Sequence, residues 1–212
     1  ARPEMNASGY RDVDVVITTR ELGRMIREAG LDFKHLPEDS YDSPLGTGTG
    51  AAVIFGTTGG VMEAALRTAY EVITGKTLED VNFTAVRGME GIKEATVKIG
   101  DLDVNVAVAS STGKASELLE MVKKGEKNYT FIEIMGCPGG CVNGVSSQIR
   151  NWTDIRPLRA KALYDEDASK KLRKSHENPE IKQIYEEYLG KPNGHKSHEL
   201  LHTTYEKREL YQ

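Results

Sequence analysis

The two cysteines of this 212-residue chain, Cys137 and Cys141, lie four residues apart in a loop rich in glycine. The loop follows an apolar, β-branched run, so that the stretch is FIEIMGCPGGCVNG. Such a pair has three interpretations: structural thiols in a tight turn, a redox dithiol, or ligands of a metal ion or iron–sulfur cluster. Glycine favours the third, because it lets the backbone approach a bulky inorganic group and direct N–H groups at cluster sulfurs. Two cysteines are half of a four-ligand site, so further ligands would come from elsewhere.

A strand is predicted immediately before the cysteines. Residues 129–135 are rich in aromatic and β-branched types, and apolar side chains point to both faces, Phe131 to one and Ile132 to the other. We therefore expect a strand buried on both sides, in a mostly parallel sheet flanked by helices. Ligands of such sheets bind beyond the carboxyl ends of the strands, which is where Cys137 lies.

A second glycine-rich segment, FGTTGG at residues 55–60, precedes a predicted helix over residues 61–73. It lacks the Gly-Lys-Ser/Thr ending of a P-loop and the GxGxxG spacing of a dinucleotide fold, which argues against a phosphate cradle. Two interpretations remain: backbone donors that face an electron-rich ligand, and a close helix–sheet crossing that needs small residues at Gly59 and Gly60. Glu63 is expected to be a favourable charge at the helix start rather than a catalytic acid.

The elements between and before these loops predict an α/β fold. EATVKI and VNVAVA, separated by Gly100-Asp101, are typical of a hairpin, and FTAVRG upstream also alternates. A helix over residues 113–124 then leads into the strand before the cysteines as a strand–helix–strand crossover. Near the N-terminus, residues 13–18 are predicted to be a short buried strand and residues 20–29 an amphipathic helix.

Beyond residue 150 the sequence becomes helical and charged. Helices are predicted over residues 158–174, 179–189 and 198–207. We therefore predict two regions: residues 1–150 form an α/β lobe that carries both glycine-rich loops, and residues 151–212 form a helical extension packed on the same domain.

Composition excludes several function classes. The net charge is −4, and no block of lysine and arginine is long enough to follow a nucleic-acid backbone. No apolar run approaches the roughly 20 residues that span a bilayer, so no membrane span is expected. Two cysteines four residues apart do not make a disulfide framework, and they suit a reducing, cytoplasmic and anaerobic setting.

The sequence FIEIMGCPGGCVNG resembles the third cysteine signature of the iron-only, or [FeFe], hydrogenases. The resemblance extends from RPEMNASGYRDVDVVITTREL through FGTTGGVMEAALRTAYE to ENPEIKQIYEEYLGKP and LLHTTY, essentially the whole chain. It implies one lobe of the catalytic domain, reversible reduction of protons to hydrogen, and an H-cluster in which a [4Fe-4S] cubane is joined to a two-iron subcluster. It also implies that Cys137 binds the cubane, and that Cys141 binds it and bridges to the two-iron subcluster. Met135, Phe55 and Gly56 would line the two-iron pocket.

Departures from the family pattern matter as well. Two upstream signatures, TSCCP-like and MPC-like, are missing, which implies the carboxyl-terminal part of a longer domain that is inactive without the remainder. Val145, Ser146 and Ser147 stand where the family has a glycine-rich run, and Gly136 stands where alanine is common. These changes leave a non-catalytic relative open as an alternative, either a cluster-assembly factor or a hydrogen sensor, together with an iron-free α/β binding module.

The resemblance also implies partners. They are the remainder of the catalytic domain or subunit, and ferredoxin or an NADH-linked subunit for electron transfer. The cytoplasm is the expected location, with the periplasm open because a signal sequence would lie outside this chain.

Overall fold

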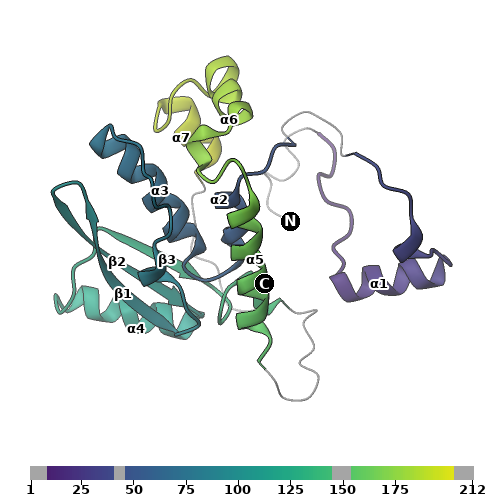
Figure 1. Cartoon of the computed structure of the whole chain (residues 1–212). Coiled ribbons are helices and arrows are strands. Elements are labelled where there is room, and N and C mark those ends of the chain that lie inside the picture. The colour runs from purple at the N-terminus through teal and green to yellow at the C-terminus, as the bar shows by residue number, and fades with distance from the viewer. Residues whose placement is uncertain (1–8, 41–45, 145–153, 203–212) are drawn as a thin grey trace. The chain divides into compact units, whose positions relative to one another are not determined.

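The computed structural model describes residues 9–40, 46–144 and 154–202 (Figure 1). The chain divides into two compact units, one made of Ala1–Tyr41 and Gly144–Thr153, the other of Asp42–Asn143 and Asp154–Gln212. Both glycine-rich loops belong to the second unit. The predicted boundary after residue 150 falls outside the described residues and stays a prediction.

In the first unit the predicted helix is confirmed as α1 (Thr19–Glu28). It starts with a capping box, in which Glu21 N donates to Thr18 Oγ1 (3.2 Å) and Thr18 N donates to the Glu21 carboxylate (2.7 Å). The predicted buried strand over residues 13–18 is wrong, since these residues are exposed and form no strand. A strand needs a hydrogen-bonded neighbour, and no described segment pairs with this stretch.

The second unit contains a three-stranded sheet in the order β1-β2-β3. Its strands are β1 (Ile92–Ile99), β2 (Leu102–Ser110) and β3 (Phe131–Met135). The predicted hairpin is confirmed by the antiparallel pairing of β1 with β2, and the predicted crossover by the parallel pairing of β2 with β3. The α/β class is thus confirmed, while the described sheet is mixed rather than mostly parallel. The short turn at Gly100-Asp101 can join only antiparallel neighbours.

Helices cover both faces of this sheet (Figure 1). The side chains of α3 (Gly60–Thr74) pack on one face, and those of α4 (Thr112–Lys123) pack on the other. Successive β2 residues point to opposite faces, so Val108 contacts the α3 side and Ala109 the α4 side. Both helices agree with the sequence prediction within one residue.

The strand β3 is not buried on both faces as predicted. Phe131 and Ile134 are 40% and 48% exposed, whereas Glu133 is only 5% exposed. In the described part of the chain β3 pairs with β2 alone, so it is an edge strand and its apolar side chains lack a covering neighbour. The side chain that is buried in mid-strand is an acid, which the apolar pattern did not predict.

Two stretches upstream of the sheet form short helical turns. The apolar run before the glycine-rich segment is α2 (Gly50–Val53) followed by a 3-10 turn (Ile54–Gly56). The alternating stretch FTAVRG contains a 3-10 turn (Thr84–Val86) and no strand, which corrects the strand pattern expected there.

The carboxyl-terminal region is helical, as predicted. It contains α5 (Arg156–Ser169), α6 (Pro179–Ile184), a π-helical turn (Tyr185–Leu189) and α7 (His195–Leu201). The first helix ends earlier than predicted because Lys170 adopts an extended conformation, and residues 203–207 of the last predicted helix lie outside the described residues. None of the helices that the structure describes combines the length and apolar composition needed to cross a bilayer.

Candidate functional site

The cysteine loop, residues 136–143, begins where β3 ends, as the sequence predicts. Cys137 and Cys141 are free thiols, and both are exposed. The loop is closed by a hydrogen bond from Gly140 N to Cys137 O (3.0 Å) and continues into a 3-10 turn (Cys141–Asn143). Neither thiol lies in a dry apolar interior, so both are accessible to a metal.

The glycine-rich turn, residues 55–60, lies against the cysteine loop. Thr58 N donates to Gly139 O (3.0 Å). Gly140 has φ +89°, and a Cβ at this position would lie 2.8 Å from both Thr58 N and Met135 Sδ. The loop therefore approaches the turn as closely as glycine allows.

The structure thus brings together the predicted site residues that are about 80 positions apart in the sequence. Met135 contacts the cysteine loop at Gly140, and the 3-10 turn that holds Phe55 and Gly56 contacts the one that begins at Cys141. Phe55 is 47% exposed, and Gly56 lies close to Leu163 of α5.

The amino-terminal end of α3 is occupied by a side chain of the protein itself. Both oxygens of the buried Glu133 carboxylate accept backbone hydrogen bonds, one from Gly59 N and one from Met62 N, each 2.7 Å long. These donors are therefore not available to an external ligand. A carboxylate at this helix end is stabilised by the charge-assisted bonds and the helix dipole.

Close packing explains Gly59 and Gly60 instead. A Cβ on Gly59 would lie 2.0 Å from Val86 O, and one on Gly60 would lie 1.7 Å from Ile54 O. The need for small residues is confirmed at both positions, but their close neighbours are the 3-10 turns Thr84–Val86 and Ile54–Gly56 rather than the sheet that was expected.

Lys93 of β1 is also buried beneath the glycine-rich turn, with 9% of its surface exposed. Burial lowers its pKa from 10.5 to about 8, although the nearby carboxylates of Glu133 and Glu90 act in the opposite direction. Neither Lys93 nor Glu133 is among the site residues predicted from the sequence. Glu133 is the single charged residue of β3, and that isolation is the signal that could have pointed to it. The strand β1 carries Lys93, Glu94 and Lys98, so nothing in its pattern distinguishes Lys93.

The lowered pKa of Lys93 predicts a pH-dependent stability. Between about pH 8 and 10.5 the unfolded chain binds a proton that the folded chain does not, so the free energy of unfolding should rise with pH, by up to about 3 kcal/mol. The difference between wild type and Lys93→Met, measured by urea unfolding from pH 7.5 to 10.5, should show this rise. Lys98→Met, at an exposed lysine of the same strand, should not remove it.

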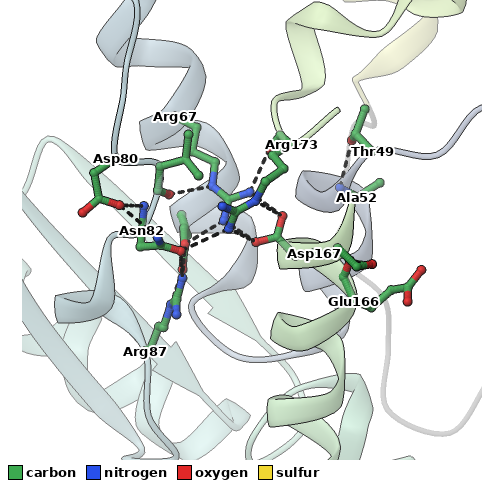
Figure 2. Close-up of polar contacts among 12 residues, drawn as sticks. Thr49, Ala52, Arg67, Asp80, Asn82, Arg87, Glu166, Asp167 and Arg173 are labelled. Carbon is green, nitrogen blue, oxygen red and sulfur yellow. Dashed lines mark hydrogen bonds and ion pairs between the residues drawn. The ribbon is translucent and has the colours of Figure 1, made fainter. Parts of the chain in front are cut away.

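A buried ionic network connects α3 with α5 (Figure 2). The Arg67 guanidinium donates to both oxygens of Asp167 and to Glu63, at 2.8 Å in each case, and all three side chains are fully buried. Arg87 adds two further hydrogen bonds to Glu63, and Arg173 binds Asp167. Burial alone would lower the pKa of Arg67, but the hydrogen bonds that it donates to Asp167 and Glu63 keep the pKa above its usual value. Glu63 therefore acts as a structural ion-pair partner, in agreement with a non-catalytic role.

One other group of side chains has the composition of a metal site. Glu71, His176 and Glu177 bring potential ligand atoms within 4.8 Å of one another. The Lys174 ammonium already donates to Glu71 (2.6 Å) and Glu177 (3.0 Å), so a cation of the protein occupies this position. The hydrogen bond from Lys174 helps to lower the pKa of Glu71 to about 2.

The residues of the cysteine loop fit an iron–sulfur cluster. Two accessible thiols stand on one loop, and thiolates are the ligands that iron–sulfur clusters prefer. Gly139 and Gly140 adopt positive φ values of +83° and +89°, which lets the backbone between the thiols turn tightly without side chains in the way.

Known proteins are similar to this chain in sequence and fold. Residues 1–145 match the family of the iron only hydrogenase large subunit, C-terminal domain, and residues 153–208 match the iron hydrogenase small subunit. The chain is 53% identical over 211 residues to the NADP-reducing hydrogenase subunit HndD of Solidesulfovibrio fructosivorans. This match covers 99% of the present chain and 36% of HndD. It is 46% identical over 214 residues to iron hydrogenase 1 of Clostridium pasteurianum, in a match that covers 97% of this chain and 37% of that protein. The chain thus spans little more than a third of the length of these relatives.

A solved structure of a variant of the [FeFe]-hydrogenase HydA1 from Chlamydomonas reinhardtii superimposes with a TM-score of 0.69 at 42% identity, over 92% of this chain and 56% of that chain. Similarity to the protein NAR1 of Arabidopsis thaliana is lower, at 30% identity over 205 residues, with 92% of this chain and 42% of NAR1 covered. The paired thiols, the glycine-rich turn against them and the matches over nearly the whole chain lead to one conclusion: this chain belongs to the iron-only hydrogenase family.

Proposed function

We propose that this chain works as part of the catalytic subunit of an iron-only hydrogenase, which interconverts protons and hydrogen. The observation that carries the proposal is the cysteine loop, in which two exposed thiols flank a pair of glycines that pack against the glycine-rich turn. The close hydrogenase relatives support it, and the lower identity to NAR1 makes an assembly factor the second candidate.

In this proposal Cys137 and Cys141 hold the [4Fe-4S] cubane as thiolates, and Cys141 also links it to the two-iron subcluster. The H-cluster, when bound, supplies the chemistry of hydrogen formation. The protein contributes ligands, shape and exclusion of water. Met135, Phe55 and Gly56 would line the pocket of the two-iron subcluster.

The test is anaerobic reconstitution of the full-length protein with iron, sulfide and a synthetic two-iron precursor. Infrared bands of carbonyl and cyanide ligands, together with a cubane signal in electron paramagnetic resonance, are the expected result. A cubane signal without these bands would support an assembly-type protein, and a colourless protein would support an iron-free binding module.

A substitution makes the assignment of Cys141 specific. Cys141→Ser should lose the infrared bands of the two-iron subcluster, because a serine hydroxyl is a poor substitute for a bridging thiolate. Thr130→Ser, at an exposed position just before β3, should keep them. Equal spectra for the two variants would contradict the role of Cys141.

The electron partner is proposed to be either ferredoxin or a subunit linked to a pyridine nucleotide. HndD is a subunit of an NADP-reducing hydrogenase, which favours the second. Hydrogen-dependent reduction of NADP⁺, NAD⁺ and ferredoxin by the purified complex distinguishes the partners. A cytoplasmic location is part of the same proposal.

A further inference from the structure

Two opposite charges are buried in one row across the sheet. Lys93 of β1 faces Val108 of β2, and Val108 faces Glu133 of β3. Residues that face one another in paired strands project to the same side of the sheet. The ammonium and the carboxylate therefore both lie on the side covered by α3, and both reach the glycine-rich turn, Glu133 at Gly59 and Lys93 at Thr58.

Two segments of the chain lie against Gly139, which stands between the two cysteines. The first is the glycine-rich turn, through the hydrogen bond from Thr58 N to Gly139 O. The second contains Met89, whose Sδ would be 3.2 Å from a Cβ on Gly139. These segments are about 30 residues apart in the sequence. The loop can keep one geometry only if an interaction holds the two segments in a fixed position relative to each other.

Lys93 is bonded to both segments. Its Nζ donates to the carbonyl and the hydroxyl oxygen of Thr58, at 3.2 Å each, and to Gly88 O at 2.9 Å. Gly88 directly precedes Met89. An ammonium has three donors and no acceptor, so these three oxygens use its whole hydrogen-bonding capacity.

We propose that Lys93 is a positioning residue for the iron ligands, which fixes the cysteine loop by holding Thr58 and Gly88 together beneath it. The inference rests on the proposed function, in which Cys137 and Cys141 bind iron. The hydrogen bonds of Lys93 go to Thr58 and Gly88 rather than to a thiol, and its effect passes through Thr58 and Met89 to Gly139. Without the ammonium, the buried carbonyl group of Thr58 and the less buried one of Gly88 lose a charged donor, and the surface on which the loop rests is no longer held in one arrangement.

The experiment compares three variants of the full-length protein. Lys93→Met removes the ammonium and keeps an unbranched chain, whereas Lys93→Arg keeps a cation. The matched control is Lys98→Met on the same strand, where the lysine is exposed and pairs with the exposed Asp103. Amide hydrogen exchange is measured on iron-free protein, and the paramagnetic resonance spectrum of the reduced cubane and iron loss to a chelator are measured on reconstituted protein.

Lys93→Met should raise exchange about tenfold at the amides of Thr58 and Gly140, while the β2 amides stay protected. In the reconstituted protein it should change the cubane spectrum and accelerate iron loss about tenfold, as expected when a residue that supports metal ligands is removed. Lys93→Arg should restore the spectrum in part, because the cation remains.

The proposal is overturned if Lys93→Met matches Lys98→Met in exchange and in the cubane spectrum. It is also overturned if exchange rises equally throughout β2, since that result describes a general stabilising role. If Lys93→Met does not fold, Thr58→Val decides: it removes the hydroxyl partner of Lys93 at nearly constant volume and should alter the spectrum in the same direction. Wild-type protein that binds no iron would instead overturn the proposed function itself.

Discussion

Replacement of Arg67 with methionine is expected to lower the free energy of unfolding by about 3–5 kcal/mol. Arg67 donates to Glu63, to both oxygens of Asp167, and to the carbonyl groups of Val81 and Arg173. Methionine fills a similar space and donates nothing. Two fully buried carboxylates would then lose their central cation, and a buried charge without compensation is among the most costly changes in a folded protein.

Urea unfolding followed by circular dichroism measures this loss. Lys161→Met is a suitable control, because it removes a lysine that forms an exposed ion pair with Asp165 on α5, and it should cost less than about 1 kcal/mol. A similar stability of the two variants would show that Arg87 and Arg173 compensate for Arg67. Since the network joins α3 to α5, its loss is expected to loosen α5 before it disturbs the sheet.

A second large effect is expected from Gly60→Ala, which should cost about 4 kcal/mol or more. The new Cβ would lie 1.7 Å from Ile54 O and 2.5 Å from Ile54 C, both backbone atoms that cannot rotate away. Relief requires a shift of the Ile54–Gly56 turn or of the start of α3. A shift of the turn moves Phe55 and Gly56 relative to the cysteine loop, so iron binding in the reconstituted protein should weaken as well.

Gly113→Ala is the control for this prediction. Gly113 lies in the first turn of α4 with nothing within 4 Å of its Cβ position, so its replacement should change stability by less than about 1 kcal/mol. Thermal unfolding and iron content of both variants provide the comparison. If Gly60→Ala is as stable as the wild type, the packing between Gly60 and the backbone of Ile54 is looser than the structure indicates.

Local sequence patterns predicted the elements that position the site. The alternation in VNVAVA, the apolar stripe of α3 and the strand before Cys137 are features of neighbouring residues, and each corresponds to an observed strand or helix. The position of the cysteine loop follows from them, because a strand end determines where the next residues emerge.

The charged residues around the site could not be predicted in this way. Lys93 and Arg67 appear in the sequence as ordinary polar positions, and the isolated Glu133 gives no indication of its partner. The burial of all three depends on contacts with segments that are distant along the chain. Glu133 binds amides more than 70 residues away, and Arg67 binds a carboxylate 100 residues away. The prediction of a strand at residues 13–18 was wrong for a different reason. Its β-branched composition favours a strand, but composition cannot provide the neighbour with which a strand pairs.

The exposed edge of β3 affects how this chain behaves when it is handled alone. Its outer backbone groups are unpaired within the described sheet, and Phe131 and Ile134 leave apolar surface beside them. Such an edge is a template for strand-by-strand aggregation at high concentration. A lysine in place of Ile134 would act as a gatekeeper against aggregation, and it would leave the carboxylate of Glu133, on the opposite face of the strand, free to bind α3.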